Sequence, residues 1–238
     1  MGIKIDRKKP RLIWASFFYR LHTILPLNNK AKFKLYLNMT AMFERLSHQM
    51  SFKNFGPHNH PHRTHARIFR DKFLNKEFTV LDLGCATGDI SNELAEKTKK
   101  VVGIDHNPVS VKEASRKHQR ENLEFYQGDA QEFLQKNNAK FDLLILSHIL
   151  EHLDNPKDFL LKFKDYFGYI YIEVPDFDKT YLNHYRKELN MRLIYTDDDH
   201  VSEFDRYELL EILKECNITV VEALYRFGIQ HLWCKVEK

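Results

Sequence analysis

Short apolar runs and amphipathic stretches alternate regularly from residue 79 onward. The apolar runs, rich in β-branched residues and leucine, predict strands at Thr79–Leu83, Val101–Asp105, Leu123–Gln127, Leu143–Ser147 and Tyr169–Val174. The stretches between them predict helices near residues 89–98, 108–118, 131–137 and 156–167. Asn107-Pro108 and Asn155-Pro156 each offer an N-cap followed by proline at the first helical position. Nearly continuous apolar strands separated by helices predict a parallel sheet with both faces covered.

The end of the chain departs from this alternation. Two strand-like runs, Thr219–Arg226 and Gln230–Val236, are joined only by Phe227-Gly228. A connection this short cannot hold a crossover helix, so the two strands must pair antiparallel. Asp205, with Glu208 three residues later, resembles a capping box and predicts a helix before this hairpin. The sequence therefore predicts an α/β fold whose mostly parallel, seven-stranded sheet ends in an antiparallel hairpin.

The first 55 residues read as a helical extension, which divides the chain into an N-terminal segment at 1–55 and a domain at 56–238. A short amphipathic helix is expected over residues 11–26, ending before Pro26, and a second around Lys32–Gln49. Two prolines keep the start of the following segment extended, and Thr64–Leu74 then predicts a third helix. We expect the first helix to pack on the domain; resting on an anionic membrane surface is the alternative.

The composition excludes a disordered protein and a membrane-spanning one. The chain has 238 residues, 43% of them hydrophobic and 13% aromatic, which suits one domain with a large core and excludes disorder. No apolar run reaches the ~18–20 residues that a membrane-spanning helix needs. Three widely spaced cysteines form no disulfide framework, which indicates a reducing compartment and a cytoplasmic protein.

Charge is distributed unevenly along the chain. Residues 1–78 contain 16 Lys and Arg against four acidic residues, a net charge of +12, whereas the other 160 residues carry a net charge of −8. Such asymmetry suggests an anionic partner for the basic segment, and peripheral contact with the inner membrane face is one form of it. The alternative is a solvated extension that docks on the acidic domain. The sequence does not fix the oligomeric state.

The loop after the first predicted strand is the most informative stretch. Gly84 and Gly88 give the backbone freedom to turn between a buried strand and a helix, and a ligand can lie against the main chain there. A dinucleotide site would place a third small residue where Asp89 stands, and this carboxylate would repel a pyrophosphate. Asp82 and Asp89 suit a ligand with a positive centre. Asp105, ending the second strand, can accept hydrogen bonds from ribose hydroxyls, and Asp129, ending the third, from an adenine amino group.

These motifs together resemble a class I S-adenosylmethionine-dependent methyltransferase. The resemblance covers roughly residues 60–238 and rests on Leu81–Gly88, Gly103-Ile104-Asp105, Gly128-Asp129-Ala130, Phe141-Asp142, Ser147–Leu153, Glu173-Val174-Pro175 and the tail from His200. It implies an enzyme with the Rossmann-like methyltransferase fold and S-adenosylmethionine as cofactor. Many members have glycine where this chain has Ala86, which is small enough for binding. The implied cofactor contacts are Asp82, Gly84, Cys85, Ala86, Gly88, Asp105, His106, Asp129, Ala130 and Ser147.

A histidine-rich constellation follows the fourth predicted strand. His148, Glu151 and His152 have the i, i+3, i+4 spacing that one helical turn places on one face, and His200 lies in a loop expected at the same mouth. The four are candidate catalytic residues and candidate ligands for Mn²⁺, Fe²⁺ or Zn²⁺. The spacing is similar to the Glu-x-x-Glu-His…His site of metal-dependent ribose methyltransferases acting on small-RNA ends, with His148 in place of a Glu. The alternative is a methyltransferase without metal, in which Leu-Glu-His caps a helix and lines the substrate pocket.

The expected acceptor comes from the segment before the first strand. His60–His65 resembles a His-Pro-x-His-Arg element of bacterial methyltransferases acting on surface glycans, which implies acceptor contacts at His62, Arg63 and His65. His184, Tyr185 and Arg186 are further candidates on the insert after Pro175. We expect O-methylation of a small anionic acceptor, phosphorylated or sugar-linked, in surface-polysaccharide synthesis. RNA ribose methylation is one alternative, and a non-catalytic cofactor-binding or membrane-docking protein is another.

Overall fold

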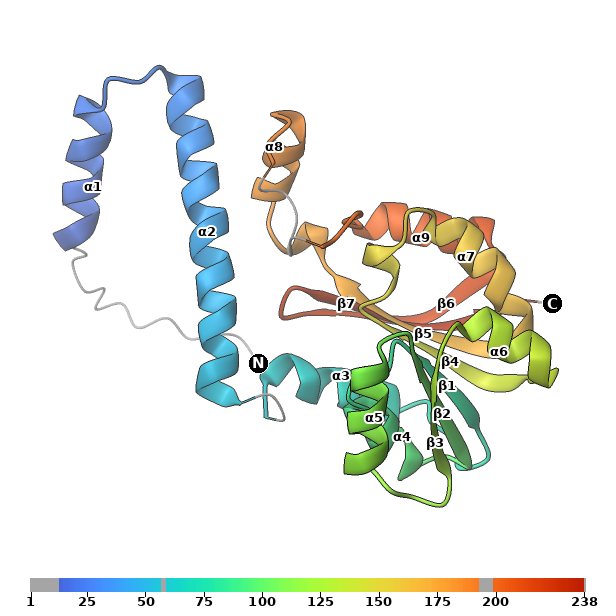
Figure 1. Cartoon of the computed structure of the whole chain (residues 1–238). Helices are drawn as coiled ribbons and strands as arrows, with labels where there is room; N and C mark the ends of the chain where they lie inside the picture. The colour runs from blue at the N-terminus through green and yellow to red at the C-terminus, as the bar shows by residue number, and fades with distance from the viewer. Residues whose placement is uncertain (1–12, 57–58, 193–198, 238) are drawn as a thin grey trace.

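A computed structural model describes residues 13–56, 59–192 and 199–237, and Figure 1 shows its arrangement. One sheet forms the centre of the fold. Its strands are β1 (Thr79–Leu83), β2 (Lys100–Asp105), β3 (Leu123–Gln127), β4 (Phe141–Ser147), β5 (Phe167–Pro175), β6 (Ile218–Arg226) and β7 (Ile229–Val236). The α-helices are α1 (Ile13–Ile24), α2 (Asn29–Phe55), α3 (Pro61–Asp71), α4 (Asp89–Ala95), α5 (Pro108–Lys117), α6 (Ala130–Asn137), α7 (Pro156–Phe163), α8 (Leu182–Glu188) and α9 (Arg206–Glu215).

The strand order confirms the predicted fold class. The seven strands run in the order β3-β2-β1-β4-β5-β7-β6. Strands β1 to β5 pair parallel, and β7 pairs antiparallel with both β5 and β6. Because the first five strands are parallel, their carboxyl ends meet along one edge of the sheet. In an open α/β sheet this edge carries the ligand crevice.

Helices cover the two faces of the sheet and produce two apolar clusters. One cluster joins α6, α7 and α9 to the strands through side chains such as Leu134, Leu160 and Leu213. The other joins α3 and α4 to the opposite face through Phe69 and Leu94. Figure 1 shows α5 beside α4 on this second side. The predicted N-caps are all present: the side chains of Asn107, Asn155 and Asp205 accept from backbone N–H groups at the starts of α5, α7 and α9.

Three helical predictions differ from the structure in detail. Helix α2 is longer than predicted, and α3 begins at Pro61 rather than Thr64. The predicted turn after β4 is only a 3-10 turn, η1 (Leu150–His152), and His148 precedes it with a left-handed φ of 56°. His148 therefore does not share a helical face with Glu151 and His152. None of the helices in the described part of the chain has the length and hydropathy that crossing a bilayer requires.

The two N-terminal helices form a hairpin that projects from the domain (Figure 1). Helix α2 ends at Phe55, next to the predicted boundary at 55/56; the division into domains itself stays a prediction. Helix α1 contacts α2 through its polar side, where His22 Nδ1 lies 2.8 Å from Tyr36 Oη and Lys32 Nζ donates to the His22 carbonyl. The expectation that the first helix packs on the domain is wrong for this structure, because Trp14 and Tyr19 are about three-quarters exposed.

Arg186 fastens α2 to the domain. Its buried guanidinium donates to Asn183 Oδ1 on α8 and to the Leu37 carbonyl and Thr40 Oγ1 on α2. We expect Arg186→Ala to free α2 without unfolding the sheet, because these bonds join only α8 and α2. Limited trypsin digestion should then cut within residues 29–55 on the order of tenfold faster. Unchanged cleavage, in a variant whose circular dichroism is normal, would show that other contacts hold α2.

Candidate active site

The loop between β1 and α4 takes the tight form that its glycines allow. Gly84 and Gly88 have left-handed φ values of 72° and 78°. The backbone N–H groups of Gly84 and Cys85 both donate to the Ile104 carbonyl on β2, which fixes the loop at the carboxyl edge of the sheet. A Cβ on Gly88 would lie 2.5 Å from Phe125 Cζ, so only glycine fits there. The exposed Ala86, at φ 45°, is the part of the loop that a ligand can reach.

Asp105 holds this loop from the end of β2. One carboxylate oxygen accepts from the Ala86 N–H at 2.9 Å, and the other accepts from the Asn107 N–H at 2.8 Å. The side chain is nearly buried, yet it ends at the carboxyl edge beside the fully accessible His106. Both oxygens retain further lone pairs. Asp105 can therefore organise the loop and still accept hydrogen bonds from a ligand.

The two carboxylates expected to face a positive centre are already engaged. Asp82 is buried beneath the loop and accepts from Ser91 Oγ at 2.5 Å, which ties β1 to α4. Burial raises the pKa of Asp82 to about 6, against the hydrogen bond from Ser91 that lowers it. Asp89 pairs with Lys117 on α5; although burial disfavours its charge, this lysine holds the pKa of Asp89 below its ordinary value. The structure thus makes Asp82 a buried support of the loop.

The remaining predicted cofactor residues lie around the same edge. Asp129 is exposed after β3 and uses one carboxylate oxygen as the N-cap of α6. Ala130 and Cys85 are buried, and burial raises the pKa of the Cys85 thiol, so this cysteine is a packing residue. Ser147 is half-buried at the end of β4. These residues therefore lie together at the carboxyl edge of the sheet.

The segment after β4 closes over the glycine loop. A Cβ on Gly84 would overlap Ile149 Cδ1, so the absence of a side chain at Gly84 allows this close approach. His148 is held at the end of the strand by its backbone N–H, which donates to the Glu173 carbonyl. Residues that follow β4 therefore lie directly beside the loop that would hold a cofactor.

Three of the four predicted metal ligands meet at this place. One ligand atom from each of Glu151, His152 and His200 lies within 4.8 Å of the others. The Glu151 carbonyl accepts from the N–H groups of Val201 and Ser202, which brings the 199–203 segment against η1. His200 Nδ1 lies 2.9 Å from Glu203 Oε1, which leaves Nε2 as the ligand atom. Asp197 and Asp198, cited with His200 in the prediction, lie outside the described residues.

His148 is the fourth predicted ligand, and its surroundings suit a cation instead. Its Nδ1 lies 2.9 Å from Glu151 Oε1 and its Nε2 lies 3.5 Å from Glu173 Oε1. Burial opposes the charge, but the hydrogen bonds and charges of the two carboxylates outweigh it and raise the pKa of His148 to about 10. A protonated imidazole has no lone pair for a metal. The ligand atoms that lie together among the described residues are therefore those of Glu151, His152 and His200, and His148 lies beside them between two carboxylates.

This pairing predicts a pH dependence. Because the folded-state pKa of His148 lies above its ordinary value of 6.5, its stabilising effect is complete below pH 6.5 and is lost as pH rises toward 10. The difference in unfolding free energy between the protein and His148→Asn should therefore shrink across this window. Urea unfolding of both proteins at a series of pH values measures it. A constant difference from pH 6 to 10 would mean that His148 is not held as a cation.

A buried ionic network around Glu173 lies next to His148, and none of the sequence motifs predicted it. Glu173 on β5 accepts from Tyr171 Oη at 3.0 Å and lies 3.9 Å from Arg70 on α3 and 3.8 Å from His231 on β7. Burial opposes its charge, but His148, His231 and Arg70 hold the pKa of Glu173 well below its usual range. A glutamate within the apolar strand Tyr-Ile-Glu-Val was the available signal, since buried charges are almost always paired.

The predicted acceptor residues differ in burial and in the residues that they contact. His62 is buried at the start of α3, and burial lowers its pKa to about 4, so its ring is neutral at pH 7. Arg63 is exposed, and the His65 ring lies 5.2 Å from Phe227 in the hairpin turn. His184 pairs with Asp178 at 2.6 Å, while Tyr185 packs on Phe33 of α2. Arg186 is corrected to a packing residue, because its guanidinium is engaged by α2 and α8.

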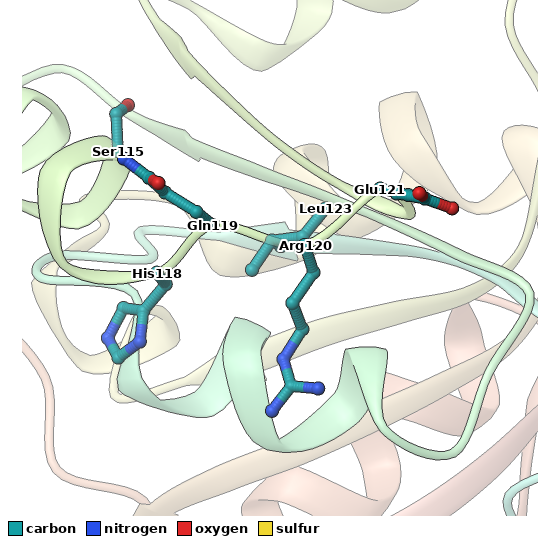
Figure 2. Close-up of a pocket in the computed structure, with 6 residues that line it drawn as sticks. All are labelled: Ser115, His118, Gln119, Arg120, Glu121 and Leu123. Carbon is teal, nitrogen blue, oxygen red and sulfur yellow. The ribbon is translucent and has the colours of Figure 1, made fainter.

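An open hollow elsewhere on the surface does not compete with this site. Figure 2 shows its lining side chains around the connection from α5 to β3, with His118 and Arg120 extended over a neighbouring helix. Arg120 pairs with Glu96 and His118 lies 3.2 Å from Asp89, so both side chains tie α4 to this connection. The hollow lies at the amino end of β3, away from the carboxyl edge that carries the glycine loop.

Comparison with known proteins agrees with the site. The sequence pattern of the methyltransferase domain family matches residues 74–215, more than half of the chain. A ubiquinone biosynthesis O-methyltransferase of Histophilus somni is 37% identical over 87 residues, covering 34% of this chain and 36% of the relative. The corresponding enzyme of Maricaulis maris is 30% identical over 84 residues, covering 34% and 33%. The chain thus spans about a third of the length of these curated relatives.

Solved structures share the fold at low sequence identity. A structure titled a DhpI–SAH complex has a TM-score of 0.58 and 19% identity, covering 84% of this chain and 96% of that one. A putative methyltransferase from Bacillus halodurans has a TM-score of 0.58 and 14% identity, covering 73% and 98%. Sheet order, glycine loop and family match agree: the chain belongs to the methyltransferase domain family and has the fold of the class I S-adenosylmethionine-dependent methyltransferases.

Proposed function

We propose that the chain transfers a methyl group from S-adenosylmethionine to an oxygen atom of a small anionic acceptor. The cofactor, when bound, supplies an electrophilic methyl group on a sulfonium, so the protein mainly aligns the acceptor and excludes water. Family membership supports the cofactor. The relatives named O-methyltransferases support oxygen as the acceptor atom.

The residues at the carboxyl edge fit this cofactor. The loop at 84–88 has small side chains and an exposed main chain at Ala86, and Asp105 and Asp129 stand at the ends of the two neighbouring strands. We assign the ribose hydroxyls to Asp105 and the adenine amino group to Asp129, because carboxylates accept from both kinds of donor.

The group formed by Glu151, His152 and His200 is the single observation that carries the assignment to oxygen. Glu151 is fully buried, and its Oε2 has no hydrogen-bond partner among the described residues. An unpartnered buried carboxylate oxygen is costly unless a ligand or proton completes it. These side chains would hold a divalent cation such as Mn²⁺, Fe²⁺ or Zn²⁺, which would lower the pKa of an acceptor hydroxyl.

Without a metal the same side chains can manage the acceptor proton. A hydroxyl must lose its proton to attack, and Glu151, His152 or His200 can take it as a general base. His148, held as a cation between Glu151 and Glu173, positions the Glu151 carboxylate through the 2.9 Å contact at Oε1. This role leaves Oε2 without a hydrogen-bond partner among the described residues.

The anionic character of the acceptor is proposed from Arg63. Arg63 is exposed on α3, the helix whose Arg70 lies 3.9 Å from Glu173, and it follows the buried His62. A guanidinium can bind a carboxylate or a phosphate with two parallel hydrogen bonds. The two curated relatives described above carry names from ubiquinone biosynthesis, and the surface-polysaccharide pathway stays a prediction.

A coupled assay for S-adenosylhomocysteine formation tests the proposal. We expect turnover with small hydroxylated carboxylates or phosphates, loss of turnover in excess chelator, and recovery with Mn²⁺. Full activity in chelator would remove the metal and leave the general base. Methyl incorporation into total RNA would instead indicate the ribose methyltransferase alternative. Cofactor binding without turnover on any acceptor would contradict catalysis.

A further inference from the structure

The apolar face of α1 has no covering partner in the described structure. Trp14, Phe17, Phe18 and Leu21 have the i, i+3, i+4, i+7 spacing of a single helical face. Their exposed fractions run from 42% to 74%. His22, through which α1 contacts α2, lies one helical turn after Phe18 at the margin of this face, so the contact leaves all four side chains exposed. An exposed aromatic face of this kind is typical of a helix that binds an apolar partner or surface.

Helix α2 adds a second exposed apolar stripe. Leu35, Met42, Leu46 and Met50 lie on one face at i, i+7, i+11 and i+15, and all four are exposed. The opposite face of α2 carries the buried Leu37 and meets α8. At 1.5 Å per residue the stripe is about 22 Å long. The hairpin therefore has exposed apolar side chains on both of its helices.

The positive charge of the hairpin indicates which kind of partner would cover its exposed apolar side chains. The hairpin, residues 13–55, has six Lys and Arg and one acidic residue, Glu44. Glu44 itself lies 3.7 Å from Arg186, toward α8. Two copies of so basic a hairpin would repel each other face to face, whereas an anionic surface complements it. The acidic domain of the same chain is the other candidate, but α1 stands apart from it (Figure 1).

We propose that the α1–α2 hairpin, residues 13–55, docks on the surface of an anionic lipid bilayer. The aromatic side chains of α1 enter the boundary between headgroups and acyl chains, as amphipathic helices do at membrane interfaces. Arg20 lies near the anionic headgroups. The hairpin rests on the surface, and neither helix spans it. This inference is independent of methyl transfer, because lipid binding needs no turnover.

Vesicle co-sedimentation of the full chain tests the proposal. We expect binding to vesicles of equal parts phosphatidylglycerol and phosphatidylcholine, and little binding to phosphatidylcholine alone. The double variant Trp14→Ser/Phe18→Ser should weaken binding by at least about tenfold, because two buried aromatic side chains are lost. Arg20→Glu should weaken it by about fivefold or more. Raising the salt to about 1 M should weaken the binding of the unmodified chain as well, by screening the charges.

Matched control variants separate the hairpin from the rest of the surface. Tyr207 on α9 is as exposed as Trp14, and Lys214 on the same helix is an exposed cation. Tyr207→Ser and Lys214→Glu should bind like the unmodified chain. Equal binding to neutral and anionic vesicles, or no binding to either by correctly folded protein, overturns the proposal. A dimer that Trp14→Ser/Phe18→Ser dissociates, with no vesicle binding, would show that a second copy covers this face.

Discussion

Asp105→Ala is expected to weaken the binding of S-adenosylmethionine by at least about 100-fold. The substitution removes the carboxylate that we assign to the ribose hydroxyls, and hydrogen bonds to a charged group are the stronger kind. It also leaves the Ala86 and Asn107 N–H groups without their acceptor, so the loop itself loses its fixed shape. Isothermal titration with the cofactor or its demethylated product measures the change.

Two further substitutions distinguish binding from general damage to the sheet. Asp105→Asn keeps one oxygen acceptor for the loop and should lose less affinity than Asp105→Ala. Asp142 at the start of β4 likewise accepts from a backbone N–H and a hydroxyl, both of Thr79, but at the opposite edge. Asp142→Ala should lower stability and leave the cofactor affinity unchanged. If Asp105→Ala binds the cofactor as tightly as the unmodified chain, the ribose assignment is wrong.

The second large effect is expected on catalysis, from Glu151→Gln. The change keeps the size of a fully buried side chain and removes its charge. The acceptor hydroxyl then loses its base or the principal ligand of its metal, and kcat should fall by about 100-fold or more. Cofactor affinity should stay within about twofold, because no cofactor contact is assigned to Glu151.

The same substitution at Glu93 provides the matched control. Glu93 on α4 pairs with Arg70, which also lies beside Glu173, so it belongs to the same set of charges without reaching the acceptor side. Glu93→Gln should retain kcat. A Glu151→Gln variant with full kcat and normal folding would falsify the role given to the group of Glu151, His152 and His200.

Local signals in the sequence were sufficient for the sheet and its helices. Buried strands such as Leu143–Ser147 are nearly continuous apolar runs, and side-chain caps such as Asn107 and Asp205 act within three residues. Such features depend on neighbours in the chain and can therefore be predicted from it. The glycine loop was equally accessible, because Gly84 and Gly88 occupy positions that need a left-handed backbone.

Contacts between distant segments were not accessible in the same way. His148 was predicted as a metal ligand from its spacing to Glu151 and His152, but its ring lies between the carboxylates of Glu151 and Glu173, and both raise its pKa. Arg186 was predicted as an acceptor contact on the insert after Pro175, but α2 engages its guanidinium. In both cases the role depends on a partner that only the folded chain brings near. Sequence spacing identifies a group of residues, and packing decides what each one does.

Calorimetric titration of the unmodified, correctly folded chain with S-adenosylhomocysteine tests the central claim most directly. The carboxyl-edge site, formed by the 84–88 loop, Asp105 and Asp129, predicts saturable heat with one molecule bound per chain. The absence of any heat or thermal stabilisation at saturating concentrations would contradict the cofactor site on which the proposed chemistry depends.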